Sequence, residues 1–279
     1  MIYRVTVSSD RMTVFSAVDF AATKSEIPWF LCGAYSRILL CEEVWKIPAG
    51  RATYDLDIAI CVESLKVYTQ FRADLCKTYN FKQHRNTEHR LIHSSGISVD
   101  IIPFGKFAEP DELYKWGTDR AFTMNVPGFS DARSSTISFL LNDKLEIESA
   151  GYAAQFVLKL FAWHDRRSSK GIDDASDLAY FLVNALKSIP DKDIYNKYDS
   201  VLQETGYDTE LASCYALGRQ IRSAFSWKTV SRVVEILRNE LQAGEDSALV
   251  SDLFDRFSSW RQPDERISAI INQVIKGIS

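Results

Sequence analysis

The sequence predicts an α+β protein in which a mixed β-sheet with flanking helices is followed by a helical bundle. Alternating and β-branched apolar runs, which are typical of strands, are strong only in the first 149 residues. A helical periodicity dominates the rest of the chain. The composition, 46% hydrophobic and 25% charged over 279 residues, is that of an ordinary folded protein. We therefore expect an α/β domain over residues 1–149 and a helical domain over residues 150–279.

Strand and helix signals alternate along the first half. The predicted strands are 28–32, 54–60, 90–93, 97–104, 136–141 and 145–147. The predicted helices are 11–25, 34–46 and 64–79. Turn-forming residues at 94–96 and 142–144 predict two hairpins. Residues 105–134 mix Gly, Pro and charged residues, which predicts irregular surface structure.

The second half contains helix signals alone at comparable strength. The predicted helices are 150–166, 173–188, 208–224, 228–242, 246–258 and 264–277. The first of them has an apolar stripe that includes Phe156 and Leu160, with Lys159 on its flank. Such stripes must pack against one another, so the sequence predicts a helical bundle here.

Charge and cysteine content exclude several classes of protein. The net charge of −4 argues against bulk electrostatic binding of nucleic acid, although a local basic patch stays possible. The five cysteines are odd in number and include no Cys-x-x-Cys, so neither a disulfide framework nor a zinc site is indicated. The N-terminus lacks a signal-peptide pattern, and no apolar stretch is long enough to span a bilayer. We therefore expect a cytoplasmic protein without membrane association.

The stretch Arg51-Ala-Thr-Tyr-Asp-Leu-Asp-Ile-Ala-Ile60 is the most informative in the sequence. Alternate side chains of a strand share a face, so Asp55 and Asp57 stand side by side while Leu56 and Ile58 face the other way. Two neighbouring carboxylates repel each other and are costly to desolvate. Open solvent offsets that cost, and so does a divalent cation such as Mg²⁺, which takes oxygen ligands. The pair alone fits a solvated face or a metal site.

Two further features flank this strand along the chain. Asp100 is the only acid in the apolar strand 97–104. It is either a third carboxylate of the same site or an outward-facing residue of an edge strand, for which Pro103 gives some support. Gly33 lies between a strand and a helix, where backbone N–H groups and the helix dipole favour an anion. The alternative for Gly33 is a simple tight turn.

In order and spacing, these features resemble the nucleotidyltransferase superfamily of the DNA polymerase beta type. Its pattern is a glycine turn opening a helix, Asp-x-Asp on a strand, and a third carboxylate on a later strand. The matching segments are 31–37 (Leu-Cys-Gly-Ala-Tyr-Ser-Arg), 51–60 and 99–105. The form Arg51-x-Thr53-x-Asp55-x-Asp57 is especially similar to that of the AbiEii-like abortive-infection toxins.

Two later segments, 156–166 and 173–178, look like further motifs of that toxin family. These motifs are a lysine within an apolar helix, here Lys159, and an aspartate opening the next helix, here Asp174. Without the resemblance, Lys159 would extend its charge to solvent, and Asp174 would cap a helix. The resemblance therefore adds a catalytic interpretation to residues that are otherwise structural.

The resemblance implies a nucleotidyltransferase that moves a nucleoside monophosphate from an NTP to an acceptor hydroxyl and releases pyrophosphate. Asp55, Asp57 and Asp100 would hold one or two Mg²⁺ ions, and Lys159 and Asp174 would assist catalysis. The implied nucleotide-binding residues are Gly33, Ala34, Ser36, Arg37 and Thr53. At Ala34 the family has Gly or Ser, so any phosphate contact from a hydroxyl would have to come from Ser36.

The acceptor stays open at the level of the sequence. The resemblance implies RNA, particularly tRNA, or a protein as acceptor, and a toxin–antitoxin or phage-defence role with a cognate antitoxin. A small molecule such as an antibiotic is the acceptor elsewhere in the superfamily. A catalytically silent binding or regulatory module is the rival interpretation, and Ala34 favours it. A basic and aromatic group in the helical half predicts either an RNA-binding face or a solvated surface; it comprises Arg219, Arg222, Trp227, Lys228, Arg232 and Arg238.

Overall fold

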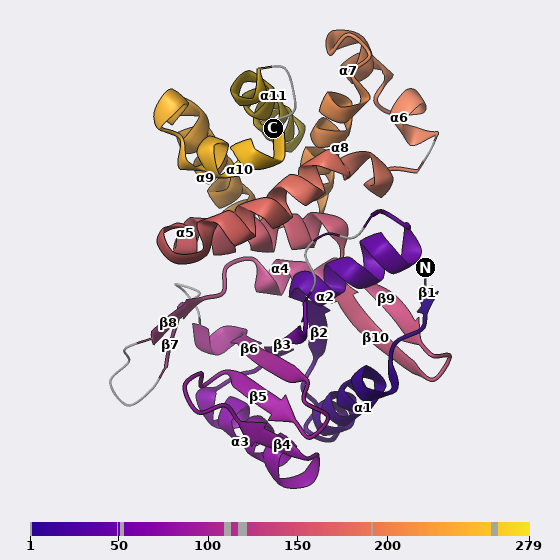
Figure 1. Ribbon diagram of the computed structural model, residues 1–279, viewed down its shortest axis with the longest axis vertical. Coiled ribbons are helices and arrows are strands. Elements are labelled where there is room, and N and C mark those ends of the chain that lie inside the picture. The colour runs from indigo at the N-terminus through magenta and orange to yellow at the C-terminus, as the bar shows by residue number, and fades with distance from the viewer. Residues whose placement is uncertain are drawn as a thin grey trace. The chain divides into compact units, whose positions relative to one another are not determined.

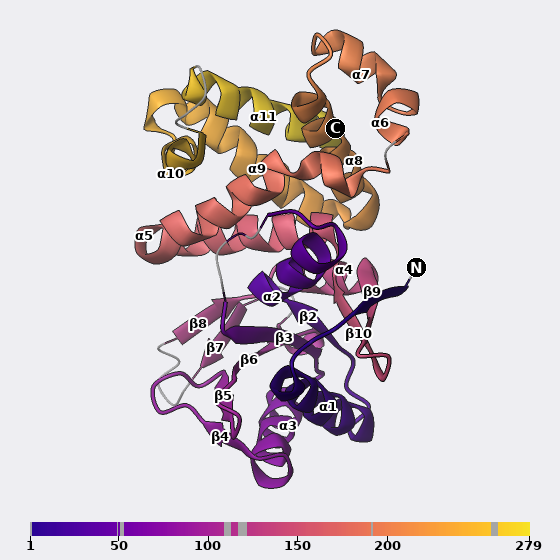
Figure 2. The same cartoon turned by 45° about the vertical axis from the view of Figure 1, so that its right-hand side comes forward.

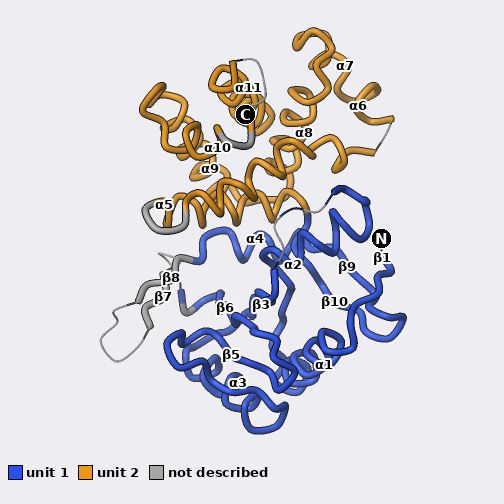
Figure 3. The backbone as a smooth tube through the Cα atoms, in the orientation of Figure 1, with its two compact units in different colours: residues 1–151 blue, residues 152–279 orange. Residues whose placement is uncertain are grey.

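The computed structural model describes residues 2–48, 50, 53–108, 113–116, 122–190, 192–257 and 262–279. Arg51, the first residue of the Asp-x-Asp stretch, lies outside the described residues. The chain divides into two compact units, residues 1–151 and residues 152–279 (Figure 3). Strands occur in the first unit and helices form the second, so the predicted α+β class is confirmed.

The first unit is built on an eight-stranded mixed sheet with the order β1-β9-β10-β2-β3-β6-β5-β4 (Figure 1). Its strands are β1 (Ile2–Val5), β2 (Trp29–Cys32), β3 (Asp55–Cys61), β4 (Phe81–Gln83), β5 (Arg90–His93), β6 (Ser98–Phe104), β9 (Thr136–Leu141) and β10 (Leu145–Ala150). The short strands β1 and β4 add to the sheet that the sequence predicts.

The centre of the sheet carries the predicted acids. Strand β3 pairs antiparallel with β2 and parallel with β6, and β6 pairs antiparallel with β5. Strand β6 is therefore an interior strand, and the edge-strand alternative for Asp100 is wrong. Pro103 is accommodated in the parallel ladder opposite Ile60. Leu56 and Ile58 are fully buried, as their position on the other face of β3 predicts.

Helices α1 (Ser9–Lys24) and α3 (Leu65–Thr78) lie side by side against the sheet (Figures 1 and 2). Each begins at a serine whose side chain accepts a backbone N–H, Ser8 for α1 and Ser64 for α3. The Tyr68 hydroxyl of α3 donates a 3.1 Å hydrogen bond to the Ile101 carbonyl of β6. This contact fixes α3 on the strand that carries Asp100.

Residues 105–134 are more regular than the sequence predicts. The described part contains a two-stranded ribbon, β7 (Leu113–Trp116) and β8 (Phe122–Asn125), and the short helix α4 (Phe129–Ser134). Four-residue strands leave too short an alternating pattern to stand out among the Gly, Pro and charged residues around them. Phe129 places its ring 6.0 Å from the ring of Phe104, which anchors α4 on β6.

The second unit is a set of helices with the long helical segment α5 (Tyr152–Val183) at its start. The other helices are α6 (Asp193–Asn196), α7 (Asp199–Glu204), α8 (Thr209–Ala224), α9 (Trp227–Ala243), α10 (Ala248–Phe257) and α11 (Pro263–Ile278). No described helix of either unit has the combination of length and apolar character needed to cross a bilayer.

Segment α5 is a helical hairpin with two arms side by side (Figures 1 and 2). Lys159 of one arm bonds Asp174 and Asp177 of the other. A straight helix would separate Lys159 from Asp174 by about 22 Å along its axis. The sequence predicts these arms as two helices, 150–166 and 173–188, and in the structure they form one helical segment, Tyr152–Val183, that folds back on itself.

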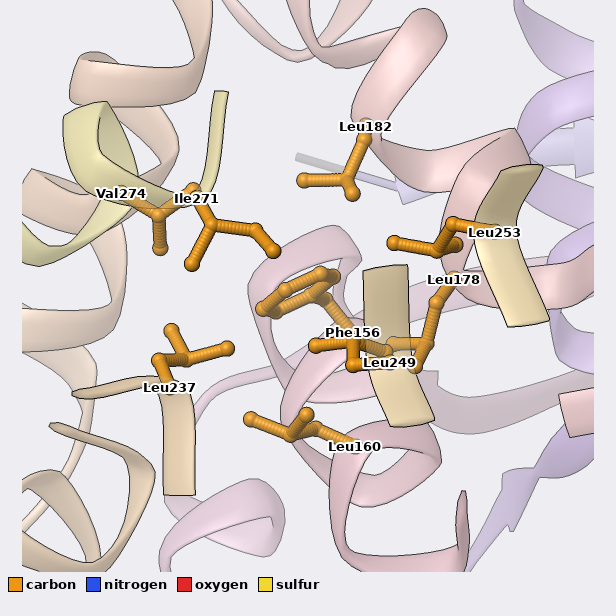
Figure 4. Close-up of a pocket in the computed structure, with 9 residues that line it drawn as sticks. All are labelled: Phe156, Leu160, Leu178, Leu182, Leu237, Leu249, Leu253, Ile271 and Val274. Atoms are coloured by element: carbon orange, nitrogen blue, oxygen red, sulfur yellow. The ribbon is translucent and has the colours of Figure 1, made fainter. Parts of the chain in front are cut away.

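The core of the second unit is apolar throughout. Nine side chains from both arms of α5 and from α9, α10 and α11 enclose a cavity of about 10 Å³ (Figure 4). They are Phe156, Leu160, Leu178, Leu182, Leu237, Leu249, Leu253, Ile271 and Val274. A void this small with no polar lining stays dry, so it is a packing defect and not a ligand site.

Helices α8 and α11 cross at two glycines. A Cβ atom on Gly218 would lie 2.2 Å from the carbonyl oxygen of Val274 and 2.9 Å from the Cα of Gly277. A Cβ atom on Gly277 would lie 2.0 Å from the carbonyl oxygen of Tyr215. Backbones approach this closely only where side chains are absent, so the pair sets the distance between the two helices.

Candidate active site

Three carboxylates share one face of the central strands. Asp57 of β3 lies directly opposite Asp100 of β6 in the parallel ladder, and Asp55 lies opposite Ser98 one step along. Residues directly opposite each other on adjacent strands point to the same face, and so do residues two apart on one strand. The sheet therefore gathers Asp55, Asp57 and Asp100, the three acids that the sequence singles out.

Gly33 closes one side of this face. It has a φ angle of +67° and begins α2 (Gly33–Arg37), which continues as a π-helical segment over Ile38–Val44. A Cβ atom at position 33 would lie 2.0 Å from Oδ2 of Asp57. Both the backbone conformation and the carboxylate contact therefore require glycine. The structure joins the predicted glycine turn to the predicted Asp-x-Asp.

Arg90 of β5 closes the other side, opposite Asp100 in the antiparallel ladder. Its Nε donates to Oδ1 of Asp100 at 2.7 Å and its Nη2 donates to Oδ2 at 2.8 Å. The same Nη2 also donates to Oδ2 of Asp55 at 2.9 Å. These hydrogen bonds, which outweigh burial, raise the pKa of Arg90 above its usual value, so the guanidinium stays charged.

Two more polar side chains contact the acids. The Thr53 hydroxyl donates a 2.5 Å hydrogen bond to Oδ1 of Asp55, so this predicted nucleotide-binding residue orients a carboxylate. Nε2 of His89 lies 3.8 Å from Oδ2 of Asp100. Burial lowers the pKa of His89, against the opposing effect of Asp100, which favours a neutral imidazole at this position.

The residues that follow Gly33 point into the unit. Ser36 is fully buried, with its Oγ 2.7 Å from Oγ of Ser149 and donating to the Ala150 carbonyl at 3.2 Å. Arg37 is 1% exposed and forms an ion pair with Glu42 at 2.5 Å. Ala34 is also buried. Any contact of this turn with a ligand therefore falls to its backbone N–H groups.

Lys159 and Asp174, the other predicted catalytic residues, belong to the second unit and bind each other. Nζ of Lys159 lies 3.1 Å from Oδ1 of Asp174 and 2.7 Å from Oδ2 of Asp177. Arg166 binds both oxygens of Asp174, at 3.0 and 2.9 Å. Burial works to lower the pKa of Lys159, but the carboxylates of Asp177 and Asp174 outweigh it and raise the pKa. Two anions and two cations thus neutralise one another within α5.

The basic group of the helical unit is only partly available to a ligand. Arg232 is half-buried, with its guanidinium 5.2 Å from the centre of the Phe161 ring and 3.7 Å from Asp165. Arg222 lies over the ring of Trp227, which is 71% exposed. Arg238 lines an open groove of about 520 Å³ between α9 and α11, together with Lys276.

The donor chemistry of the first unit fits a hard divalent cation. Carboxylate oxygens from two adjacent strands are the ligands that Mg²⁺ prefers. Among the described residues, no group of three or more His, Cys, Asp and Glu side chains is arranged to hold a metal ion as it stands. In the described arrangement, the carboxylates of Asp55 and Asp100 are held by Arg90. The three carboxylates are thus suitable ligands for Mg²⁺, but in the structure Arg90 pairs with two of them.

Comparison with known proteins finds similarity to solved structures. No family model matches the chain, and no curated protein matches it. The chain is similar to the crystal structure of an antigenic nucleotidyltransferase-like protein from Paracoccidioides brasiliensis, with 16% identity and a TM-score of 0.41 over 63% of this chain and 77% of the other. It is also similar to apo form II of a CCA-adding enzyme, with 11% identity and a TM-score of 0.28 over 98% and 82%. Neither of these two structures is described as an AbiEii-like toxin.

Two important residues, Arg90 and Asp177, are not among the predicted site residues. Arg90 has a detectable signal, because a three-residue loop at 94–96 fixes the register of the hairpin and places residue 90 opposite residue 100. Asp177, the second partner of Lys159, lies three residues after Asp174 and so on the same helix face. Both signals depend on the position of a residue within its strand or helix, so they can be used only once the limits of these elements are known.

Proposed function

We propose that this protein is a Mg²⁺-dependent nucleotidyltransferase that moves a nucleoside monophosphate from an NTP to an acceptor hydroxyl. One observation carries the proposal, namely Asp57 directly opposite Asp100 on adjacent parallel strands, with Asp55 beside them and Gly33 against Asp57. It supports the proposal because carboxylates gathered on one half-buried face repel one another, and a bound cation relieves that repulsion. The resemblance of the motifs supplies the reaction class.

In this proposal Asp55, Asp57 and Asp100 would hold the metal. When bound, Mg²⁺ neutralises triphosphate charge and lowers the pKa of the acceptor hydroxyl. The hydroxyl oxygen forms a bond to the α-phosphorus, the bond from this phosphorus to the bridging oxygen breaks, and pyrophosphate leaves. The carboxylate of Asp100 accepts the hydroxyl proton. Thr53 keeps Asp55 in orientation, and the backbone N–H groups after Gly33 receive the terminal phosphates.

For the acceptor we propose RNA, particularly tRNA, with a protein as the other macromolecular candidate. The exposed Arg219, Arg222, Lys228 and Arg238 support a polyanion, since they are the basic members of the predicted group that extend into solvent. A toxin role, with an antitoxin that blocks transfer, is the biological setting in which the motif resemblance places such an activity. It predicts arrested growth on expression of the active protein alone.

The test is incubation of the protein with Mg²⁺, each labelled NTP in turn and total tRNA, beside the Asp57→Asn variant. We expect label on tRNA only with the unaltered protein. The variant removes a charge while keeping the shape of the side chain, so it should fold normally. Label on the protein itself would indicate a protein acceptor, whereas equal transfer by Asp57→Asn would contradict the proposed site.

A catalytically silent binding module is the second candidate function. The observation that favours it is Arg90, which neutralises part of the acid cluster without any metal. This candidate predicts no transfer with any NTP and no rise in melting temperature with Mg²⁺ and nucleotide, because a ligand that binds only the native state would raise it. Transfer of label to any acceptor would eliminate it.

A further inference from the structure

Arg90 is the strongest feature of the molecule that the proposed reaction leaves without a role. Its guanidinium uses two nitrogens on the two oxygens of Asp100, and one of them also reaches Asp55 across the sheet. Planar, two-point binding of this kind is the strongest ion-pair geometry available to a carboxylate. The side chain is 31% exposed, whereas that of Asp100 is 11% exposed.

The guanidinium and a metal ion would need the same oxygens. Arg90 engages both oxygens of Asp100 and Oδ2 of Asp55, and Thr53 engages the remaining oxygen of Asp55. Each carboxylate oxygen keeps a second lone pair, so a cation held by all three carboxylates would bind the same oxygens as these donors and lie close to the guanidinium. Positive charges that converge on the same carboxylates also repel each other, so simultaneous full occupancy is unfavourable.

We propose that Arg90 is a resident counter-cation that a divalent metal displaces from Asp100 and Asp55. The inference rests on the proposed metal site and specifies how the negative charge of that site is compensated when metal is absent. Arg90 prevents the three carboxylates from facing one another uncompensated, and its exposed part lets it turn to solvent without being buried unpaired. Metal binding then exchanges one cation for another. The apparent affinity of the site for the metal is lowered, because the ion pair of Arg90 with Asp100 and Asp55 must first open.

Binding of Mn²⁺ measures this exchange directly and does not depend on catalysis. Titrations followed by electron paramagnetic resonance would compare the unaltered protein with Arg90→Gln, Arg90→Lys and Lys82→Gln. Lys82 is an exposed residue of β4, two strands from Asp100, so Lys82→Gln removes the same charge without touching the carboxylates. We expect Arg90→Gln to bind Mn²⁺ at least about tenfold more tightly, consistent with loss of a charge-assisted ion pair.

The variant Arg90→Lys distinguishes competition between Arg90 and Mn²⁺ for the carboxylates from a general effect of positive charge. It keeps the positive charge but loses the planar fork, so competition predicts tighter Mn²⁺ binding than in the unaltered protein. It also provides the measurement if Arg90→Gln does not fold. Lys82→Gln should bind Mn²⁺ like the unaltered protein.

Three results would overturn the inference. Equal or weaker Mn²⁺ binding by both Arg90 variants would show that Arg90 does not compete. Tighter binding by Lys82→Gln to the same extent as by Arg90→Gln would reduce the effect to net charge. Binding in none of the proteins, with folding verified by circular dichroism, would remove the metal site and the proposed function with it. The first two results leave the proposed function intact, so the failures are distinguishable.

Discussion

Gly33 and Asp57 form a contact in which each residue restricts the other. We expect Gly33→Ala to lower Mn²⁺ affinity and nucleotidyl transfer by at least about tenfold, because the new methyl group would displace the Asp57 carboxylate, which lies 2.0 Å from its position. The positive φ of position 33 adds strain of about 1 kcal/mol. Mn²⁺ titration and thermal unfolding measure the two effects separately.

Gly96 offers a matched control for this substitution. It also has a positive φ, +89°, but a Cβ atom there would meet nothing within 4 Å. Gly96→Ala should therefore show the backbone strain and normal Mn²⁺ affinity. If Gly33→Ala and Gly96→Ala bound Mn²⁺ equally well, the contact with Asp57 would have no role in the site.

His93 makes stability depend on pH. It is 6% exposed, its ring lies 5.0 Å from that of Phe81, and its Nδ1 accepts the Ser95 N–H at 3.1 Å. Burial lowers the pKa of His93, and Asp10 opposes this shift only in part. The unfolded chain therefore takes up a proton first as pH falls below about 6.5, and the free energy of unfolding decreases from there down to the pKa of the folded state.

The measurement is thermal unfolding from pH 7.5 to pH 5, compared with His93→Asn. We expect the midpoint of the unaltered protein to fall by a few degrees more than that of the variant, as about 1 kcal/mol shifts the midpoint of a chain of this size by roughly 2–4 °C. Parallel pH profiles for the two proteins would contradict this assignment.

At the level of single residues, the sequence predicted the acids better than their surroundings. Asp55, Asp57 and Asp100 follow from strand alternation and chain order, because those patterns are local. The burial of Ser36 against Ser149 depends on a strand more than 100 residues away along the chain, and no local pattern contains it. The catalytic and nucleotide-binding roles of all these residues stay predictions.

The α5 hairpin depends on charges that its own two arms provide. Lys159 lies between the buried carboxylates of Asp174 and Asp177. We expect Lys159→Met to destabilise the protein by about 3 kcal/mol, because removal of one partner leaves uncompensated buried charge. Thermal or urea unfolding measures the loss.

Lys197 is the control for the substitution of Lys159. It also pairs with a carboxylate, Asp193 at 2.7 Å, but its side chain is 66% exposed. Lys197→Met should change the midpoint very little, since exposed ion pairs contribute little to stability. Equal effects of the two substitutions would show that the Lys159 cluster is not a structural element.

The crossing of α8 and α11 reverses an ordinary rule for helices. Replacing a helical glycine by alanine normally stabilises a helix by about 1 kcal/mol. We expect Gly218→Ala to destabilise the protein by about 1–3 kcal/mol, because the methyl group would overlap the Val274 carbonyl oxygen. A higher melting temperature for Gly218→Ala would show that the helices separate without loss.

Elements were predicted well where they are long and strongly periodic. Helices α8, α9 and α11 begin and end within one residue of their predicted limits. The sequence did not predict the ribbon of β7 and β8 or the short helices α6 and α7, since four to six residues carry little periodic signal. The π-helical segment after Arg37 was predicted as ordinary helix, because apolar spacing does not distinguish the two.

At the scale of the whole molecule, the sequence predicted the class of each half but not the sheet order. Neighbours such as β1 and β9 pair across more than 130 residues, and β10 separates β9 from β2. Such pairings are decided by the packing of the complete unit, which no window of sequence contains. The periodicity of the apolar residues nevertheless separates the strand-containing unit from the helical one, because strand and helix periods differ over long stretches.

The contact between Gly33 and Asp57 also constrains how this protein can diverge. A lineage that gains any side chain at position 33 loses the space for the carboxylate at position 57, and a lineage that loses the carboxylate is released from the need for glycine. The two positions should therefore change together among descendants of a common ancestor. Wherever both are altered, we expect a chain that has given up cation binding while retaining its sheet.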